Sequence, residues 1–396
     1  MTEKKICLPF FFRRVNDLRQ FLPIIDFLKK KNHILLISLN KDFEINSYEP
    51  LYQYKNHSNI EIYHIYDFLC QKNFFLKYLY HLCEKFIFLT KFKSFFRKLL
   101  LSKNNLKKIL NRYKIKQAIF DFPISNQNYR NLVTLISSFN VKIIGIHHGI
   151  WVRFTDLKKK RYKNFFLSQK KNSEIYDKIV VFNPDFKKNL EKLGCKNKFI
   201  FFGSFYDKWK KFKLQRSNKN NPIKILYLDH SSKHGIIKIN VVKDIVKIKK
   251  LKNVQIKIRP NTSIEFSKNK QDLDLFYKYG LDQNLTYNDT SKLIQESDII
   301  INPISSAIIE AFYFKKIVIH PKHYLKDDYL LWQKFKCCYE VKNTKEILRV
   351  INLFKTNKLK KKDYLKNCRK FLLFLNGKKN IKHKLNLLCE TIIKDF

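Results

Sequence analysis

Short runs of apolar residues alternate with longer segments of helical periodicity along most of this chain. The first such group is a strand at 6–12, a helix at 16–31 and a strand at 34–39. This order predicts a parallel sheet, because a parallel neighbour needs a long crossover connection. The same pattern predicts further strands at 60–64, 117–122, 141–147, 178–183, 199–203, 223–228, 254–258, 284–287, 298–301 and 317–319. We therefore expect an α/β fold.

The segments between these runs predict the helices and the domain boundary. Helical patterns cover 71–114 with a break near 102–105, then 128–139, 184–193, 241–250, 270–279, 290–296, 307–314 and 344 to the end. The segment 208–222 is basic and polar and has no apolar periodicity, which is typical of a linker. The pattern thus predicts an N-terminal doubly wound domain at 1–207 and a second one at 223–396.

Composition narrows the range of partners. The chain has 396 residues, 45% of them hydrophobic, which is enough for two domains with their own cores. The formal charge of +48 favours anionic partners such as nucleotide diphosphates, lipid phosphates or a bilayer surface. A bias towards Lys, Ile, Asn, Phe and Tyr with only 7 Gly accounts for part of this charge, so nucleic acid is the less expected partner.

Cysteine usage and the N-terminus favour a reduced, cytoplasmic setting. The eight cysteines form no CxxC pair, and a chain of this length does not depend on disulfides. The first apolar stretch is short and ends at Arg13 and Arg14, so it reads as a strand and not as a signal peptide. No run approaches the length of a membrane span.

The most informative segment is 297–319, SDIIINPISSAIIEAFYFKKIVI. It reads as a buried strand, a turn at Asn302 and Pro303, a helix at 307–314 capped by Ser305 and Ser306, and a second strand. In such a unit the start of the helix lies at the carboxyl edge of the sheet, where backbone N–H groups attract phosphate. Two serine hydroxyls add hydrogen bonds, and Glu310 could hold a ribose hydroxyl. Plain helix capping is the structural alternative for the serines.

Three other segments stand out together with 297–319, and in chain order they are 143–152 (IIGIHHGIWV), 224–230 (KILYLDH) and 254–260 (VQIKIRP). In this order the four segments resemble the GT-B glycosyltransferases, and most closely the branch of CDP-glycerol glycerophosphotransferase-like and capsule polysaccharide glycosyltransferases. Three positions differ from the branch pattern, since Pro303 and Ile304 replace an acidic–aromatic pair and Arg259 replaces a histidine. The resemblance implies two Rossmann-like domains facing across a cleft, with a C-terminal helix that crosses back to the first domain.

The resemblance also implies roles for individual residues. The histidine directly before the glycine, His148, matches the proposed catalytic base of the "HG" motif, and Ser305, Ser306 and Glu310 match the donor site. Position alone supports part of this, because a histidine at the carboxyl edge of a parallel sheet can take a proton from a sugar hydroxyl. Structural, hydrogen-bonded histidines are the alternative for His147 and His148.

Other candidate contacts follow from strand ends and loops. Arg259 ends a strand, where its guanidinium could bind phosphate, although a solvated surface arginine is the simpler reading. The loop after 228 carries Ser231, Ser232 and Gly235, which could bind phosphate through backbone N–H groups or be an ordinary connection. On the acceptor side we expect His147, Gly149, Arg13 and Asp17.

The segment 71–114 mixes many lysines and arginines with phenylalanines against the single acidic residue Glu84. This mixture suits an anionic membrane surface or single-stranded nucleic acid. Two core-packed helices with basic outer faces are the simpler explanation.

The sequence therefore predicts a glycosyltransferase that is metal-independent and needs no cofactor beyond its nucleotide-activated donor. The expected acceptor is a cell-surface glycan or a lipid-linked hydroxyl, and the expected location is the cytoplasm or the inner face of the cytoplasmic membrane. Two alternatives stay open: a CDP-alcohol polyol-phosphate transferase on the same scaffold, and a non-catalytic basic binder of RNA or acidic polymer.

Overall fold

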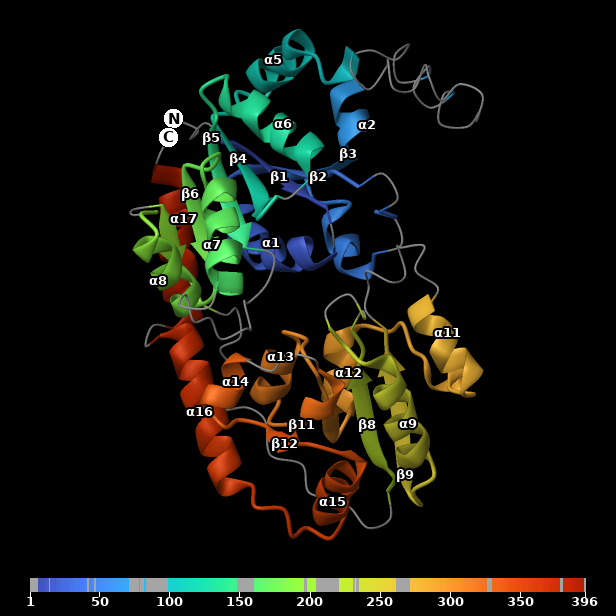
Figure 1. The fold of residues 1–396 in the computed structure, drawn as a ribbon. Coiled ribbons are helices and arrows are strands. Elements are labelled where there is room, and N and C mark those ends of the chain that lie inside the picture. The colour runs from blue at the N-terminus through green and yellow to red at the C-terminus, as the bar shows by residue number, and fades with distance from the viewer. Residues whose placement is uncertain are drawn as a thin grey trace. The chain divides into compact units, whose positions relative to one another are not determined.

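The computed structural model of the chain describes residues 6–13, 15–40, 43–45, 48–70, 78, 82, 99–124, 126–147, 160–195, 198–203, 221–230, 232, 235–260, 271–325, 330–377 and 380–394. They form two compact units, each built on a parallel sheet with helices around it (Figure 1). The α/β class predicted from the apolar pattern is confirmed.

The first unit contains a seven-stranded sheet in the order β3-β2-β1-β4-β5-β6-β7. The strands are β1 (Cys7–Phe12), β2 (His33–Ser38), β3 (Ile60–His64), β4 (Gln117–Phe122), β5 (Lys142–His147), β6 (Lys178–Val181) and β7 (Phe199–Phe201). Its described helices are α1 (Val15–Leu28), α2 (Ile65–Cys70), α5 (Lys103–Arg112), α6 (Gln127–Ser137), α7 (Lys160–Ser173), α8 (Pro184–Lys192) and α17 (Ile381–Lys394).

The central strands of this sheet are covered on both faces, and their sequences show why. Every residue of β1 and of β4 is buried, as expected for near-continuous apolar runs in a parallel sheet. Phe11 and Phe120 lie opposite each other in the β1–β4 register and their rings stack at 4.4 Å. The crossovers from β1 to β2 and from β4 to β5 run in opposite directions, so α1 and α6 lie on opposite faces (Figure 1).

The second unit contains a five-stranded sheet in the order β12-β11-β10-β8-β9. The strands are β8 (Ile223–Leu228), β9 (Val254–Arg259), β10 (Ile299–Ile301), β11 (Ile317–Pro321) and β12 (Tyr339–Val341). The described helices are α9 (Lys238–Lys249), α11 (Gln271–Lys278), α12 (Thr290–Glu296), α13 (Ile308–Tyr313), α14 (Leu331–Lys334), α15 (Thr344–Lys355) and α16 (Lys362–Asn376).

The C-terminal helix belongs to a different unit from the helices that precede it. The predicted bounds end the second domain at 396, but α17 belongs to the first unit, as the resemblance to GT-B enzymes implies for a C-terminal helix. Helix α17 packs against α1, and its Leu388 and Ile392 are buried. The second unit therefore ends with α16. The predicted linker 208–222 lies outside the described residues except for its last two positions.

Two further predictions differ from the structure. The predicted strand at 284–287 is a 3₁₀ turn at Asp282–Asn284, followed by a single parallel bridge between Leu285 and Ile258. Helix α7 was not predicted, because its basic sequence has only a weak apolar periodicity. Most of the basic segment 71–114 lies outside the described residues, and its described end is α5, capped by Ser102.

Candidate functional site

The two sheets share one topological feature, a point where successive strands change direction across the sheet. In the second sheet the chain passes from β8 to β9 on one side and then to β10 on the other, so β8 and β10 are neighbours. Ligands of open parallel sheets bind at the carboxyl edge of such a switch point. The segments that leave β8 and β10, 229–237 and 302–307, begin at this edge and contain most of the predicted donor-binding residues.

The segment after β10 is organised by Asn302, which is fully buried. Its Oδ1 accepts a hydrogen bond from Ser305 N–H at 2.9 Å, and its Nδ2 donates to the Ser305 carbonyl at 3.0 Å. The backbone N–H of Asn302 donates to the carbonyl of Ile319 on β11 at 3.0 Å. Asn302 therefore fixes Ser305 to the end of the sheet. Sequence reasoning named Asn302 only as a turn residue, although a strand-end Asn before Pro is a turn signal with a mechanism.

The two serines differ from the predicted helix cap. Helix α13 begins only at Ile308, with Ala307 at the cap position and no side-chain capping bond. Ser305 Oγ accepts from Ala307 N–H at 3.3 Å, whereas Ser306 is exposed. The serines thus lie in the turn before the helix. The side chain of Asn302 bonds to the backbone N–H and carbonyl of Ser305 in this turn.

Glu310 lies in α13, a helix whose six residues are all buried. Glu310 itself is only 6% exposed. A ribose contact by Glu310 stays a prediction.

The segment after β8 contains a buried ion pair that sequence reasoning missed. Lys238 Nζ lies 2.6 and 2.7 Å from the two carboxylate oxygens of Asp229, and both side chains are almost fully buried. Burial raises the pKa of Asp229, although the charge of Lys238 and its hydrogen bonds act in the opposite direction. Because Asp229 follows β8 and Lys238 begins α9, the pair holds the two ends of this loop together. The only feature of the sequence that could have indicated this ion pair was an acidic residue, Asp229, directly after a buried strand.

The predicted phosphate-binding loop lies between these two residues. Gly235 N–H donates to the Ser232 carbonyl at 2.9 Å, and Gly235 has a positive φ of 83°. A left-handed conformation at this turn suits glycine, because other side chains are strained there. Ser231 lies outside the described residues.

The far end of this loop is held by a second cluster. Ile237 N–H donates to the carbonyl of Tyr324 at 2.8 Å, directly after β11 and its short extension. The neighbouring His323 Nε2 lies 2.7 Å from Asp244 Oδ2 on α9, and Thr344 Oγ1 donates to the other oxygen of Asp244. The residue before α9 is therefore tied to the turn after β11, and the middle of α9 is tied to the same turn and to the start of α15.

Arg259 ends β9 as predicted, but it is buried, with 7% of the residue exposed. Its Nη1 donates to the carbonyl of Pro260 at 2.9 Å, and its guanidinium lies 5.9 Å from the ring centroid of Tyr287. Tyr287 is 48% exposed. The exposed member of this pair is the tyrosine, which the sequence analysis did not single out.

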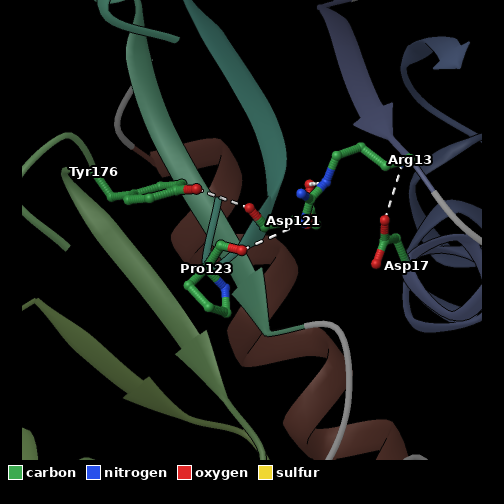
Figure 2. Close-up of polar contacts among 5 residues, drawn as sticks. All are labelled: Arg13, Asp17, Asp121, Pro123 and Tyr176. Atoms are coloured by element: carbon green, nitrogen blue, oxygen red, sulfur yellow. Dashed lines mark hydrogen bonds and ion pairs between the residues drawn. The ribbon is translucent and has the colours of Figure 1, made fainter. Parts of the chain in front are cut away.

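The switch point of the first sheet lies between β1 and β4, and a buried ion pair crosses it. Arg13 Nε donates to Asp121 Oδ1 at 3.0 Å, and the Nη2 group of Arg13 donates to Oδ2 and to the carbonyl of Pro123 (Figure 2). Asp121 is fully buried and Arg13 is 9% exposed. Burial is the largest single effect and lowers the pKa of Arg13, but the charge of Asp121, its hydrogen bonds to Arg13 and the charge of Asp17 together outweigh burial, so the net pKa is raised.

Asp17, also predicted on the acceptor side, is fully buried. One of its carboxylate oxygens accepts from the backbone N–H of Arg13 at 3.0 Å, so it holds the turn that follows β1 (Figure 2). In this structure both predicted residues stabilise the carboxyl edge of the first sheet.

Tyr176 supports the same switch point from the side of β5. Its hydroxyl donates to the backbone carbonyl of Asp121 at 2.8 Å. The ring lies so close to Gly145 that a Cβ added there would be 2.8 Å from it. Gly145 is thus needed for close approach, and burial raises the pKa of Tyr176 well above its ordinary value.

His147 ends β5 as predicted and is buried. Its ring lies 4.9 Å from that of Phe186 and 5.9 Å from that of Phe122, between centroids. The other two residues of this motif, His148 and Gly149, lie outside the described residues. Their predicted roles therefore stay predictions.

Metal and membrane features can be stated only for the described part of the chain. There, no group of three or more His, Cys, Asp or Glu side chains could hold a metal ion. Within the same ranges, no helix combines the length and the apolar character needed to cross a bilayer.

Comparison with solved structures identifies the fold. No protein-family model matches the chain, and no curated protein matches it by sequence. The UDP-GlcNAc 2-epimerase of Methanocaldococcus jannaschii, solved with UDP-GlcNAc and UDP, aligns with a TM-score of 0.58 at 14% identity, over 99% of this chain and 100% of the other. The wall teichoic acid polymerase TagF aligns with a TM-score of 0.55 at 11% identity, over 99% and 89%.

This chain has the GT-B fold. A glycosyltransferase of Rickettsia africae also aligns, with a TM-score of 0.51 at 15% identity, over the full length of both chains. The structural neighbours of this GT-B chain are thus glycosyltransferases and nucleotide-sugar epimerases. Identities this low establish the fold alone.

Proposed function

We propose that this protein is a glycosyltransferase that moves a sugar from a nucleotide-activated donor to a hydroxyl of a cell-surface glycan or lipid-linked acceptor. The observation that carries the proposal is the second switch point, where the loops after β8 and β10 begin at one edge of a GT-B unit. Two structural neighbours were solved with bound nucleotides, one with UDP and the other with UDP-GlcNAc and UDP, which supports a nucleotide donor.

The donor phosphates would bind to hydrogen-bond donors of these two loops. Ser305 and Ser306 offer hydroxyls after β10. The loop from Ser231 through Ser232 to Gly235 would offer backbone N–H groups after β8 other than that of Gly235, which already donates to the Ser232 carbonyl. Glu310 would contact the ribose. Arg259, at the end of β9 and therefore next to the end of β8, would bind the phosphates.

The acceptor side would be provided by the first unit. His148 would take the proton from the acceptor hydroxyl while that oxygen bonds to the anomeric carbon of the donor sugar and the bond from this carbon to the phosphate oxygen breaks. The nucleotide leaves with the electron pair of that bond, and no metal ion takes part. Arg13 and Asp17 would act indirectly, by fixing the edge of the sheet, while His147 and Gly149 flank the base.

Two experiments test this proposal. A thermal-shift screen with UDP, CDP, GDP and CMP should give one clear preference, because a ligand that binds only the folded state raises the melting temperature. His148→Ala should lower the rate of transfer by about 100- to 10,000-fold and leave nucleotide affinity nearly unchanged. His147→Ala, at the buried neighbouring position, should lower the rate less. Full turnover in His148→Ala would remove the catalytic assignment.

A second candidate function is favoured by the nucleotide-sugar epimerases among the neighbours. An epimerase would change the donor sugar without an acceptor, whereas a transferase releases nucleotide in proportion to added acceptor. Because the polymerase TagF is also a structural neighbour, we retain polyol-phosphate transfer as a variant of the proposal. Release of CMP from a CDP-alcohol would identify that variant.

A further inference from the structure

Helix α16 presents one face that is basic and exposed along its length. Lys362, Lys366, Arg369 and Lys370 are all exposed. Their spacing places them on one stripe of the helix, because residues three and four apart lie on the same side. Between the first and the last of them the helix rises by only about 12 Å.

The orientation of this stripe is fixed by the opposite face of α16. Tyr364 donates to the carbonyl of Lys316 at 2.6 Å, and Phe371 packs against Phe312 of α13 with ring centroids 5.7 Å apart. Phe371 and Leu375 are fully buried. The helix therefore cannot turn its cations inwards without exposing this apolar face.

The charges of the stripe are not balanced by neighbouring carboxylates. Between residues 342 and 373 ten lysines and arginines are exposed, among them Lys345 and Arg349 of α15, against one exposed carboxylate, Asp363. Within the described part of the chain, none of the four stripe cations forms an ion pair. Surface lysines elsewhere do, as Lys29 does with Asp26 at 2.8 Å. Unbalanced positive charge of this density is complementary to an anionic partner.

The stripe ends on an apolar side chain. Leu373, one turn after Arg369 and Lys370, is 53% exposed, one of the largest exposures of a large apolar residue in the described chain. Cations followed by an exposed leucine suit the headgroup region of a bilayer, where lysine and arginine meet lipid phosphates and the leucine enters the acyl boundary. Nucleic acid would instead favour exposed aromatic rings for stacking.

We propose that this face of α16 binds the surface of a membrane that contains anionic lipids. The inference is independent of the nucleotide site, because it rests on residues that the proposed reaction does not use. It assigns the membrane contact to the second unit, whereas the sequence analysis considered 71–114.

Co-sedimentation of the full chain with lipid vesicles tests the proposal. We expect binding to vesicles of phosphatidylcholine mixed with phosphatidylglycerol and little binding to phosphatidylcholine alone. Lys366→Glu with Lys370→Glu should lower the partition coefficient at least about 30-fold, since each basic residue near such a surface contributes about 1 kcal/mol. Leu373→Ser should lower it several-fold.

The matched control is Lys243→Glu with Lys247→Glu on α9. These two lysines are exposed at the same spacing, and the net charge changes equally. An equal loss in both double variants would assign binding to overall charge and overturn the proposal, as would equal binding to neutral vesicles. Displacement of the wild-type chain from vesicles by single-stranded RNA that binds through the same lysines would make α16 a nucleic-acid face instead. A thermal melt of each variant separates these outcomes from misfolding.

Discussion

The two switch points of this protein use buried charge in different ways. In the first unit Arg13 directly follows β1 and Asp121 lies on the neighbouring strand β4, so their ion pair crosses the switch point from β1 to β4. In the second unit Asp229 pairs with Lys238 of the helix that follows, and Asn302 bonds to Ser305 three residues later. Each of these two side-chain contacts joins residues less than ten positions apart in the chain.

We interpret the first switch point as a scaffold, which stabilises its sheet, and the second as a binding edge, which holds a ligand. A buried guanidinium–carboxylate pair between two strands joins them, and both charges depend on each other for solvation. A loop whose ends are held by nearby side chains keeps a fixed backbone path at the carboxyl edge of the sheet, where ligands of open parallel sheets bind. We therefore expect substitutions at the first switch point to change stability, and substitutions at the second to change ligand affinity.

The largest expected effect is the loss of the pair in the first unit. Asp121→Asn leaves the buried Arg13 without its carboxylate and should lower the free energy of unfolding by about 3–5 kcal/mol. Urea denaturation measures this. Glu191→Gln is the control, because its surface pair with Lys187 spans 3.6 Å and contributes no more than about 0.5 kcal/mol. A loss below about 1 kcal/mol in Asp121→Asn would contradict the scaffold role.

A buried cation of the second unit should make stability depend on pH. Lys316 donates to the carbonyl of Gln295 at 2.6 Å, and burial lowers its pKa to about 8 from 10.5. Between these two values the unfolded chain holds one more proton than the folded chain, so stability rises with pH there, by up to about 1.4 kcal/mol per unit. Below about pH 8 this contribution is absent.

The measurement is the difference in unfolding free energy between wild type and Lys316→Met from pH 7 to 10.5, the upper value being the ordinary pKa of lysine. The difference should be flat at first and should then move in favour of the wild type as the pH passes about 8. A difference that does not change over this range would mean that Lys316 keeps its proton in the folded state.

A smaller effect is expected at the second switch point. Asn302→Ala removes the two bonds to Ser305 and should weaken nucleotide binding about 5- to 30-fold, the equivalent of about 1–2 kcal/mol. Calorimetric titration measures this affinity. Asn343→Ala is the matched control, because Asn343 also accepts from a backbone N–H, that of Glu346, but at the start of α15. Equal affinities in the two variants would remove the distinction between scaffold and binding edge.

The pattern of apolar residues along the chain was sufficient to predict much of the fold. The apolar runs predicted β8 at its observed bounds and most other described strands within one or two residues, because burial on both faces requires continuous apolar sequence. It failed at 284–287, where a turn and one bridge replace a strand. It also missed α7, since a basic helix with little apolar periodicity carries a weak local signal.

For the candidate site, too, the sequence predicted part of the arrangement and the tertiary structure decided the rest. The sequence by itself determined that the segments around 147, 259 and 305 end buried strands, because the apolar runs stop there. Only the tertiary structure decided which of these ends are neighbours, and which charges meet. Arg13 and Asp121 are 108 residues apart, and His323 and Asp244 are 79 apart, so no local spacing relates them. Strand order brings such residues together, and strand order follows from the packing of the whole unit rather than from any single segment.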